Sequence, residues 1–187
     1  MSLRTQKLLA ASLKKMLMTR TLNEITIGEI AEDCNLRRQT FYYHYHDIYE
    51  LVEWIYIYDI SKILNLKKTS ITNDEGLFQL FQYLLENKAF VINTCKSIER
   101  GTLEQYMYRG SYMTIYSSIN EQVAGLNVKE EYKVFMVEFY QYALSGVLLK
   151  WIGNNMEEDP GEIITKMKVI ISCCLNNALI KFHEKSK

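Results

Sequence analysis

Seven polar or aromatic residues that can hydrogen-bond to DNA lie close together in the segment from residue 37 to residue 44, which reads RRQTFYYH. Arginine can form two hydrogen bonds with guanine, and glutamine can do the same with adenine. Hydroxyl groups and a helix N-terminus can hold phosphates, which fixes the register of a complex without selecting a sequence. An ordinary solvated face is the alternative, but two arginines and two tyrosines on about two helical turns favour a binding surface.

A short helix is expected directly before this segment. Apolar residues at positions i, i+3 and i+4 form one stripe, made by Ile27, Ile30 and Ala31. Thr26 stands at the N-cap position, and Glu29 three residues later completes a capping box. The pattern predicts a helix that begins after Thr26 and ends near residue 34.

The next residues predict a tight turn and a second helix. Asn35 tolerates the left-handed backbone conformation that such a turn requires, and Leu36 is expected to lie between the two helices. Phe41 and Tyr45 are four residues apart, so they share the face that turns toward a small core. The segment from residue 26 to residue 45 therefore predicts a helix-turn-helix whose outer face contacts DNA.

The same segment resembles the DNA-binding region of the TetR family of bacterial transcription regulators. The family pattern is matched by Thr26, Ile30, Ala31, Leu36, Thr40, Phe41, Tyr42 and Tyr45. The run from residue 37 to residue 42 is similar to the subgroup that contains regulators of dihydroxyacetone kinase operons. Two positions depart from the family: Asn35 replaces the usual turn glycine, and Ile48 replaces a lysine that anchors a phosphate.

The resemblance implies which residues contact DNA. Thr26 is expected to contact a phosphate. The residues on or beside the recognition helix are Arg37, Arg38, Gln39, Thr40, Tyr42, Tyr43 and His44.

The composition predicts an all-α protein. The 187 residues include one proline and eight glycines, which is too few turn residues for an all-β fold. No apolar run reaches the length that spans a bilayer, and no secretory signal stands at the N-terminus, so a cytoplasmic location is expected. The net charge is zero, but residues 1–46 carry seven basic and four acidic side chains. This modest asymmetry has the direction that a DNA-binding end needs.

The pattern predicts two domains and about nine helices. Residues 1–46 form a three-helix DNA-binding domain, and residues 47–187 form a helical effector-binding and dimerisation domain. Asp47 is expected to cap a linking helix that spans residues 47–64, and a connection is expected at residues 65–73.

Two long helices are expected at the C-terminal end, over residues 128–154 and from Pro160 to about residue 183. Asp159 is an N-cap with proline at the first helical position, which marks the start of the second helix. Both helices carry apolar residues on more than one side, which indicates a partner surface; a fully buried core pair is the alternative. The resemblance implies a homodimer through these helices, with expected interface residues Leu144, Leu148, Trp151, Ile170, Ile171, Cys174, Leu175 and Ala178.

The middle of the chain is rich in aromatic residues, and an apolar or aromatic effector is expected there. Three tyrosines at intervals of four residues share one helix face. The expected ligand-binding residues are Tyr83, Phe90, Tyr108, Tyr112, Tyr116, Phe139 and Tyr142. Core packing is the alternative for each of them, since a buried tyrosine hydroxyl also finds partners within a protein.

No catalytic residue, metal site or cofactor is predicted. The four cysteines, at positions 34, 95, 173 and 174, form no CxxC pair and are expected to be buried free thiols. His44 and His46 are two residues apart and do not share a helix face. Phosphate loops and nucleophile motifs are lacking too, which argues against an enzyme.

The sequence thus predicts a sequence-specific DNA-binding transcription regulator that binds a near-palindromic operator as a dimer. A repressor released by a small molecule is the first expectation, and an activator or co-regulator controlled by a protein partner is the alternative. The operator, the regulated genes, the sign of regulation and the effector are not specified by these patterns.

Overall fold

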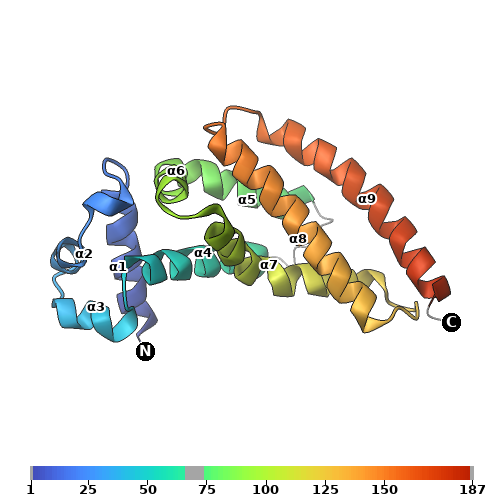
Figure 1. Cartoon of the computed structure of the whole chain (residues 1–187), viewed down its shortest axis with the longest axis horizontal. Helices are drawn as coiled ribbons and strands as arrows, with labels where there is room; N and C mark the ends of the chain where they lie inside the picture. Colours follow the sequence, from blue (N-terminus) through green and yellow to red (C-terminus); the bar gives the residue numbers. More distant parts are fainter. Residues whose placement is uncertain (1, 66–73, 186–187) are drawn as a thin grey trace.

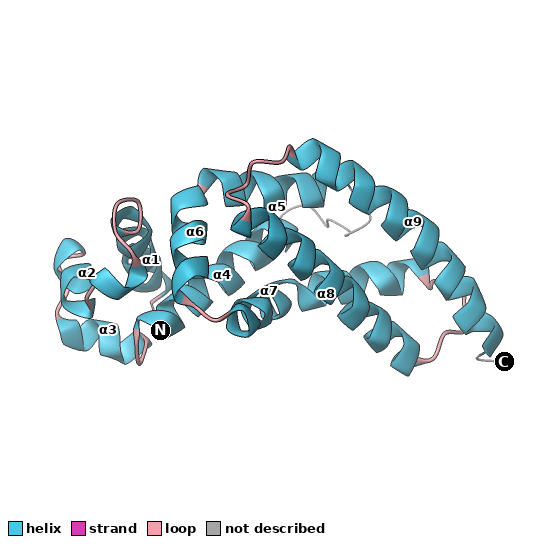
Figure 2. Cartoon of the chain, turned by 45° about the horizontal axis from the view of Figure 1, so that its top comes forward, coloured by secondary structure: helices cyan, strands magenta, loops and turns pink. Residues whose placement is uncertain are grey.

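A computed structural model describes residues 2–65 and 74–185. This part of the chain forms nine α helices and one short 3-10 helix, with no strand (Figures 1 and 2). The elements are α1 (Leu3–Met16), η1 (Leu22–Glu24), α2 (Ile27–Asp33), α3 (Arg38–His44), α4 (Ile48–Asn65), α5 (Asp74–Glu86), α6 (Lys88–Ser97), α7 (Arg100–Gln122), α8 (Glu130–Gly153) and α9 (Pro160–Lys185). The all-α prediction is confirmed.

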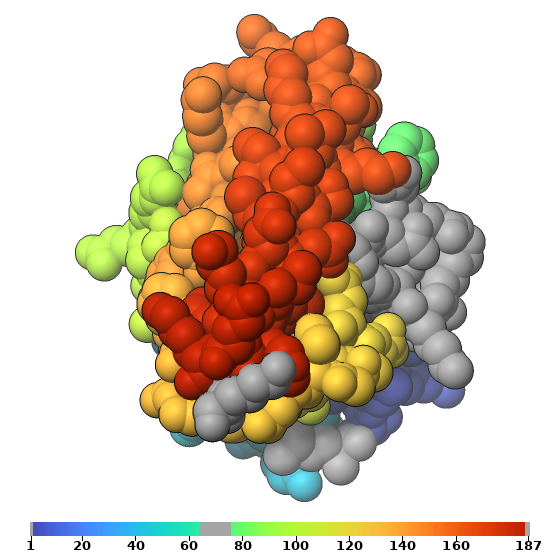
Figure 3. Space-filling view, turned by 90° about the vertical axis from the view of Figure 1, so that its right-hand side faces the viewer, coloured from blue at the N-terminus to red at the C-terminus, as the bar shows by residue number. Residues whose placement is uncertain are grey.

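The helices are arranged along one long axis. Helices α1, α2 and α3 form a small group at one end, and α4 leads from this group into the body of the protein (Figure 1). Helix α7 packs against both α4 and α8. Helix α9 contacts α5 and forms the outer layer at the far end, where Figure 3 looks onto its exposed side.

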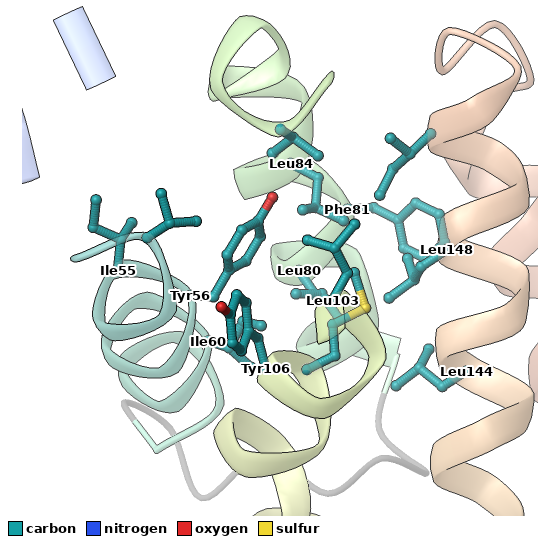
Figure 4. Packing of buried hydrophobic residues seen from close by; sticks show 14 of the residues in the cluster. Ile55, Tyr56, Ile60, Leu80, Phe81, Leu84, Leu103, Tyr106, Leu144 and Leu148 are labelled. Carbon is teal, nitrogen blue, oxygen red and sulfur yellow. The ribbon is translucent and has the colours of Figure 1, made fainter. Parts of the chain in front are cut away.

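One continuous hydrophobic core joins the two ends. It begins with Leu9 and Leu13 of α1 and extends to Leu175 and Leu179 of α9. Figure 4 shows its middle, where side chains of α4, α5, α7 and α8 meet. Helix α4 packs mainly against α7 and α5 in the body, and its contacts with α1 connect the body to the small group at the other end.

Helices α4 and α7 approach each other closely at Gly110. A Cβ atom at this position would lie 3.0 Å from Cβ of Ile60 and 3.5 Å from Cα of Ile57. Glycine therefore allows the two helices to approach this closely, since a side chain here would have to displace Ile60.

The predicted helix starts agree with the structure. The backbone N–H of Glu50 donates to Asp47 Oδ1 at 2.9 Å, and that of Glu162 donates to Asp159 Oδ2 at 3.0 Å. The 3-10 helix η1 was not predicted, since three residues give no periodic signal. Apart from residue 65, the predicted connection at 65–73 lies outside the described residues.

Two expectations are corrected at the C-terminal end. Helix α9 is long and apolar enough to span a bilayer by length and composition, with a mean hydropathy of 1.5 and 33% of the apolar window buried. Polar residues interrupt the apolar positions of α9, so the helix contains no long uninterrupted apolar run. Cys173 and Cys174 are exposed rather than buried, whereas Cys34 and Cys95 are half-buried. Burial raises the pKa of the Cys95 thiol to about 11.

Candidate nucleic-acid interface

The N-terminus of α2 is held by the predicted capping box. The Thr26 hydroxyl accepts a hydrogen bond from the Glu29 backbone N–H at 3.3 Å, and a Glu29 carboxylate oxygen accepts from the Thr26 backbone N–H at 2.8 Å. The Thr26 hydroxyl also donates to Glu29 at 2.7 Å. The hydroxyl that was expected to contact a phosphate is therefore already part of the helix cap.

The turn between α2 and α3 is a Schellman motif. Asn35 has a φ of 54°, in the left-handed region, as predicted. The Leu36 backbone N–H donates to the Ala31 carbonyl at 2.8 Å, and the Asn35 N–H donates to the Glu32 carbonyl at 2.9 Å. These two bonds satisfy the last carbonyls of α2 and reverse the chain direction within three residues. The turn thereby fixes the angle between the two helices.

Two aromatic side chains hold α3 on the core. Phe41 is fully buried and Tyr45 is 3% exposed, with 5.7 Å between their ring centroids. Burial raises the pKa of Tyr45 to about 12. The ring of Tyr45 also meets Trp54 of α4 edge to face, so α3 is tied directly to the linking helix.

The opposite face of α3 is open to solvent. Tyr42 is 52% exposed and Tyr43 is 72% exposed, which are high values for aromatic side chains. Arg37, Arg38 and Gln39 are exposed as well, whereas Thr40 and His44 are half-buried. Six of the eight predicted DNA-binding residues, including Thr26, thus lie on open surface.

The start of α3 lies beside the start of α2. A Cβ atom at Gly28 would lie 3.4 Å from Nε of Arg38 and 3.7 Å from Oγ1 of Thr26. The Arg38 guanidinium is therefore close to the first turn of α2. This arrangement places one cation and two helix N-termini in the same small area, so the local potential is positive on the side where α3 is open.

An ion pair between Arg20 and Glu29 stabilises the capping box. Arg20 Nη1 lies 2.8 Å from Glu29 Oε1. The Arg20 hydrogen bond, together with those from Thr26, lowers the pKa of Glu29 to about 2. Lys15 bonds Asp33 at 2.7 Å at the other end of α2. These acids are paired within the DNA-binding group, which reduces their repulsion toward an approaching phosphate.

His44 does not point freely outward as predicted. Its Nδ1 atom is buried and has no hydrogen-bond partner among the described residues. The ring packs edge to face on Tyr43 and also lies near Tyr45. Its position at the end of α3 explains the difference, because the chain turns there toward α4 and covers part of the ring.

The seven predicted ligand-binding residues do not share one pocket. Tyr108 and Tyr142 line a polar cavity of about 480 Å³ between α7 and α8. Phe90 lines a second cavity of about 480 Å³ beside α1, and Phe139 lines an apolar one of about 140 Å³ between α8 and α9. Tyr112 and Tyr116 stack on each other along α7, and Tyr83 contacts Asp59 of α4. The four-residue spacing of the tyrosines on α7 therefore corresponds to contacts between their rings, and it does not place the seven residues around a common cavity.

The predicted interface residues also divide into two groups. Five face the core of one chain and are at most 8% exposed, namely Leu144, Leu148, Trp151, Ile171 and Leu175. Ile170 is 62% exposed, Cys174 is exposed and Ala178 is half-buried. The exposed apolar surface of this end instead includes Phe135, Phe139, Val169 and Ile180, which the prediction had not assigned to it.

One further polar cluster was missed. Lys14 of α1 bonds Asp59 of α4 and reaches Tyr83 and Asn87 near the end of α5. The sequence does not indicate these contacts, because the partners of Lys14 lie 45 to 73 residues further along the chain.

The geometry defines a class of protein: an all-α protein with a helix-turn-helix at one end and a helical body at the other. A sequence profile described as "Transcriptional regulator C-terminal region" (TetR_C_8) matches residues 72–173, which is more than half of the chain. The chain belongs to the TetR family of transcriptional regulators, in the subgroup that includes DhaS.

Two comparisons with individual proteins agree with this assignment. The chain is 30% identical over 89 residues to the "HTH-type dhaKLM operon transcriptional activator DhaS" of Lactococcus lactis subsp. lactis (strain IL1403). The matched stretch covers 48% of this chain and spans about half the length of that relative (48%). A solved structure titled "Dihydroxyacetone kinase operon activator DhaS" has the same fold, with a TM-score of 0.69, 21% identity and coverage of 97% and 99% of the two chains.

Proposed function

We propose that this protein binds a near-palindromic DNA operator as a homodimer and regulates transcription of the adjacent genes. The observation that carries the proposal is the open face of α3. Tyr42 and Tyr43 are more than half exposed beside Arg38 and Gln39, while Phe41 anchors the helix from the opposite side. A rigid helix with this surface fits the major groove of DNA.

The side chains of this face divide into two roles. Arg38 and Gln39 lie in the first turn of α3, where recognition helices contact base edges, so we assign sequence selection to them. Arg37, Tyr42 and Tyr43 flank them and are assigned to phosphates, together with the first turn of α2 around Thr26. Base selection and phosphate contacts then come from neighbouring positions at the start of α3, and the start of α2 adds further phosphate contacts.

The dimer is assigned to the outer surfaces of α8 and α9. Phe135 and Phe139 of α8 are 60% and 58% exposed, and Val169, Ile170 and Ile180 of α9 are 54 to 62% exposed. A shallow apolar cavity between the two helices lies beside Phe139 and Ile170. So much exposed apolar surface is costly in water, and a second copy of the same helices would cover it.

A small-molecule effector is assigned to the cavity between α7 and α8. Tyr108 and Tyr142, two of the expected ligand residues, line it with Glu104, Gln141 and Ser145. The sequence-based expectation was an apolar or aromatic effector. The cavity is lined by more polar side chains than such a molecule needs. A molecule with hydrogen-bonding groups fits this lining better.

Activation is the sign of regulation that we assign, because the curated relative and the solved structure named above, both DhaS, are described as operon activators. Repression was the first expectation from the sequence and is the alternative. A reporter gene under the selected operator separates them, since deletion of the regulator lowers expression in one case and raises it in the other.

The function is tested by selection of bound DNA from a random pool with the purified full-length protein. Enrichment of a sequence with two inverted half-sites about 10 base pairs apart, or a multiple of that spacing, is the expected result. A folded, dimeric preparation that enriches no sequence would contradict the proposal.

A further inference from the structure

The side chain of Lys14 joins the group of α1, α2 and α3, which is the proposed DNA-binding group, to α4 and to the C-terminal end of α5. Its ammonium nitrogen lies 2.7 Å from Asp59 Oδ2 on α4, 3.2 Å from the Tyr83 hydroxyl on α5 and 3.1 Å from Asn87 Oδ1 directly after α5. A lysine ammonium has three hydrogens, and each has one acceptor here. Lys14 therefore uses its whole donor capacity at this junction.

The acceptors of Lys14 are also bonded to one another. The Tyr83 hydroxyl donates to the same oxygen of Asp59 at 2.7 Å, and the Asn87 amide donates to the Tyr83 carbonyl at 2.9 Å. Burial, followed by the neighbouring Asp59, raises the pKa of Tyr83, so its hydroxyl keeps the donated proton. The ammonium also lies 5.0 Å from the Tyr83 ring centroid and 5.3 Å from that of Phe90. We call Lys14, Asp59, Tyr83 and Asn87 the junction cluster.

The junction cluster is shielded from water on most sides. The side chains of Lys14 and Asp59 are 24% and 21% exposed. For comparison, the neighbouring Lys15 is 73% exposed, and its partner Asp33 lies within the DNA-binding group itself. Partial burial makes the Lys14 bonds stronger than those of a surface ion pair.

Other contacts also hold α1 in place. Leu9 and Leu13 pack into the core, and apolar packing is not directional. The Asn93 amide donates to the Leu17 carbonyl at 2.8 Å, and the Lys7 ammonium lies 5.4 Å from the Tyr58 ring centroid on α4. The junction cluster adds hydrogen bonds, which depend on distance and angle, from α1 to both α4 and the end of α5. Figure 1 shows α1 beside the start of α4 at this end of the molecule.

We propose that Lys14 is a positioning residue for operator binding, which fixes the angle of the DNA-binding group on the body and hence the distance between the two recognition helices of a dimer. Lys14 itself contacts no DNA in this role. The inference rests on the proposed function, because a defined distance between recognition helices matters only if a dimer binds two half-sites. It predicts that the junction cluster controls the spacing of half-sites and leaves their sequence unchanged.

The test uses the full-length protein and the operator that the wild type selects. Binding is measured on a series of duplexes in which one or two base pairs are added or removed between the half-sites. Each base pair moves a half-site by about 3.4 Å along the helix axis. The variants are Lys14→Met, which keeps an apolar stem but removes the three donors, and the milder Tyr83→Phe, which removes one hydroxyl. Lys96→Met, at an exposed position on α6, is the matched control.

The expected result is that Lys14→Met binds about tenfold more weakly at the preferred spacing and loses most of its preference among spacings. Tyr83→Phe shows the same change with smaller amplitude, and it also serves if Lys14→Met does not fold. Lys96→Met keeps the wild-type affinity and spacing profile. The half-site sequence selected by each variant stays the same.

Two other results would overturn the inference. A wild-type spacing profile in both Lys14→Met and Tyr83→Phe would show that the cluster does not set the distance. An equal loss at every spacing, together with a lower Tm, would show that Lys14 only stabilises the fold. If the wild type selects no DNA at all, the proposed function fails and the inference fails with it, which is a distinguishable outcome.

Discussion

The two ends of the molecule expose opposite kinds of side chain. At one end, α3 is seven residues long and exposes arginine, glutamine and tyrosine. At the other end, α8 and α9 are 24 and 26 residues long and expose phenylalanine, valine and isoleucine. Polar groups select among partners because their hydrogen bonds require a defined geometry. Apolar side chains on long helices instead provide a large surface that can be buried against a partner. The proposed function assigns a different partner to each end: DNA to the first and a second copy of the chain to the other.

Both ends also contain a fully packed aromatic side chain. Phe41 is fully buried beneath the open face of α3. Trp151 is 2% exposed near the end of α8, where its ring centroid lies 4.9 Å from that of Phe81 and its Nε1 donates to the Glu158 carbonyl at 2.9 Å. Substitutions of exposed residues leave both of these side chains in place, so we expect them to change binding more than folding.

The largest expected effect is at the apolar end. Phe139→Glu or Ile170→Glu places a charge on the proposed dimer surface, and each change occurs twice in a two-fold dimer. We expect each to weaken dimerisation by at least about 2 kcal/mol, or roughly thirtyfold, as measured by sedimentation. Met113→Glu, at a 68% exposed position on α7, is the control and leaves the dimer intact. Unchanged dimers in both variants would assign the apolar surface to another partner.

The second effect is at the polar end. Arg38→Ala and Gln39→Ala each remove a proposed base contact, so we expect a loss of about 1–3 kcal/mol of discrimination at one base pair. Binding competition between the operator and its single-base variants measures this loss. Gln82→Ala on α5 is a control at an exposed site away from α3. If Arg38→Ala keeps the same base preference, Arg38 contacts a phosphate instead.

Thr26→Ala sharpens the comparison because it acts on both stability and binding. Loss of the hydroxyl removes the capping bond to Glu29 and lowers the free energy of unfolding by about 1 kcal/mol. We expect binding to weaken equally for operator and unrelated DNA, since a helix N-terminus positions phosphates without selecting bases. Thermal unfolding and titration with both DNAs provide the measurement. Thr26→Ser, which keeps the hydroxyl, is expected to behave as wild type in both.

The smallest effect is the pH dependence of Glu29. Its pKa is lowered in the folded state from 4.5 to about 2, mainly by the hydrogen bond from Arg20. The ionised carboxylate therefore contributes stability above about pH 4.5, and this contribution is lost as the pH falls toward 2. The Tm difference between wild type and Glu29→Gln should be positive at pH 7 and shrink between pH 5 and about pH 3. A difference that stays constant over this range would mean that the shape of the side chain, not its charge, matters.

The sequence predicted most of the fold because its signals are local. Capping residues such as Thr26, Asp47 and Asp159 act within three positions, and the left-handed Asn35 acts within its own turn. Apolar periodicity likewise depends on neighbours three and four residues away. Helix positions could therefore be predicted without knowledge of tertiary contacts, and so could the open face of α3, which is defined by the burial of Phe41 and Tyr45.

Tertiary contacts account for the rest. Leu148 and Trp151 look identical to interface residues in the sequence, yet they pack inside one chain, because periodicity cannot tell which apolar face meets which neighbour. The tyrosines of α7 share a face, but the cavities of the described residues form between helices whose pairing the sequence does not specify. The partners of Lys14 are likewise far apart along the chain.

The close contact at Gly110 has a mechanical consequence. The backbones of α4 and α7 are closer here than a side chain at position 110 allows without displacement of Ile60. Gly110→Ala is therefore expected to move the two helices apart by a few tenths of an ångström, and a larger residue by more. Such a displacement would be passed on to α5 and α8, because α4 packs against α5 and α7 packs against α8.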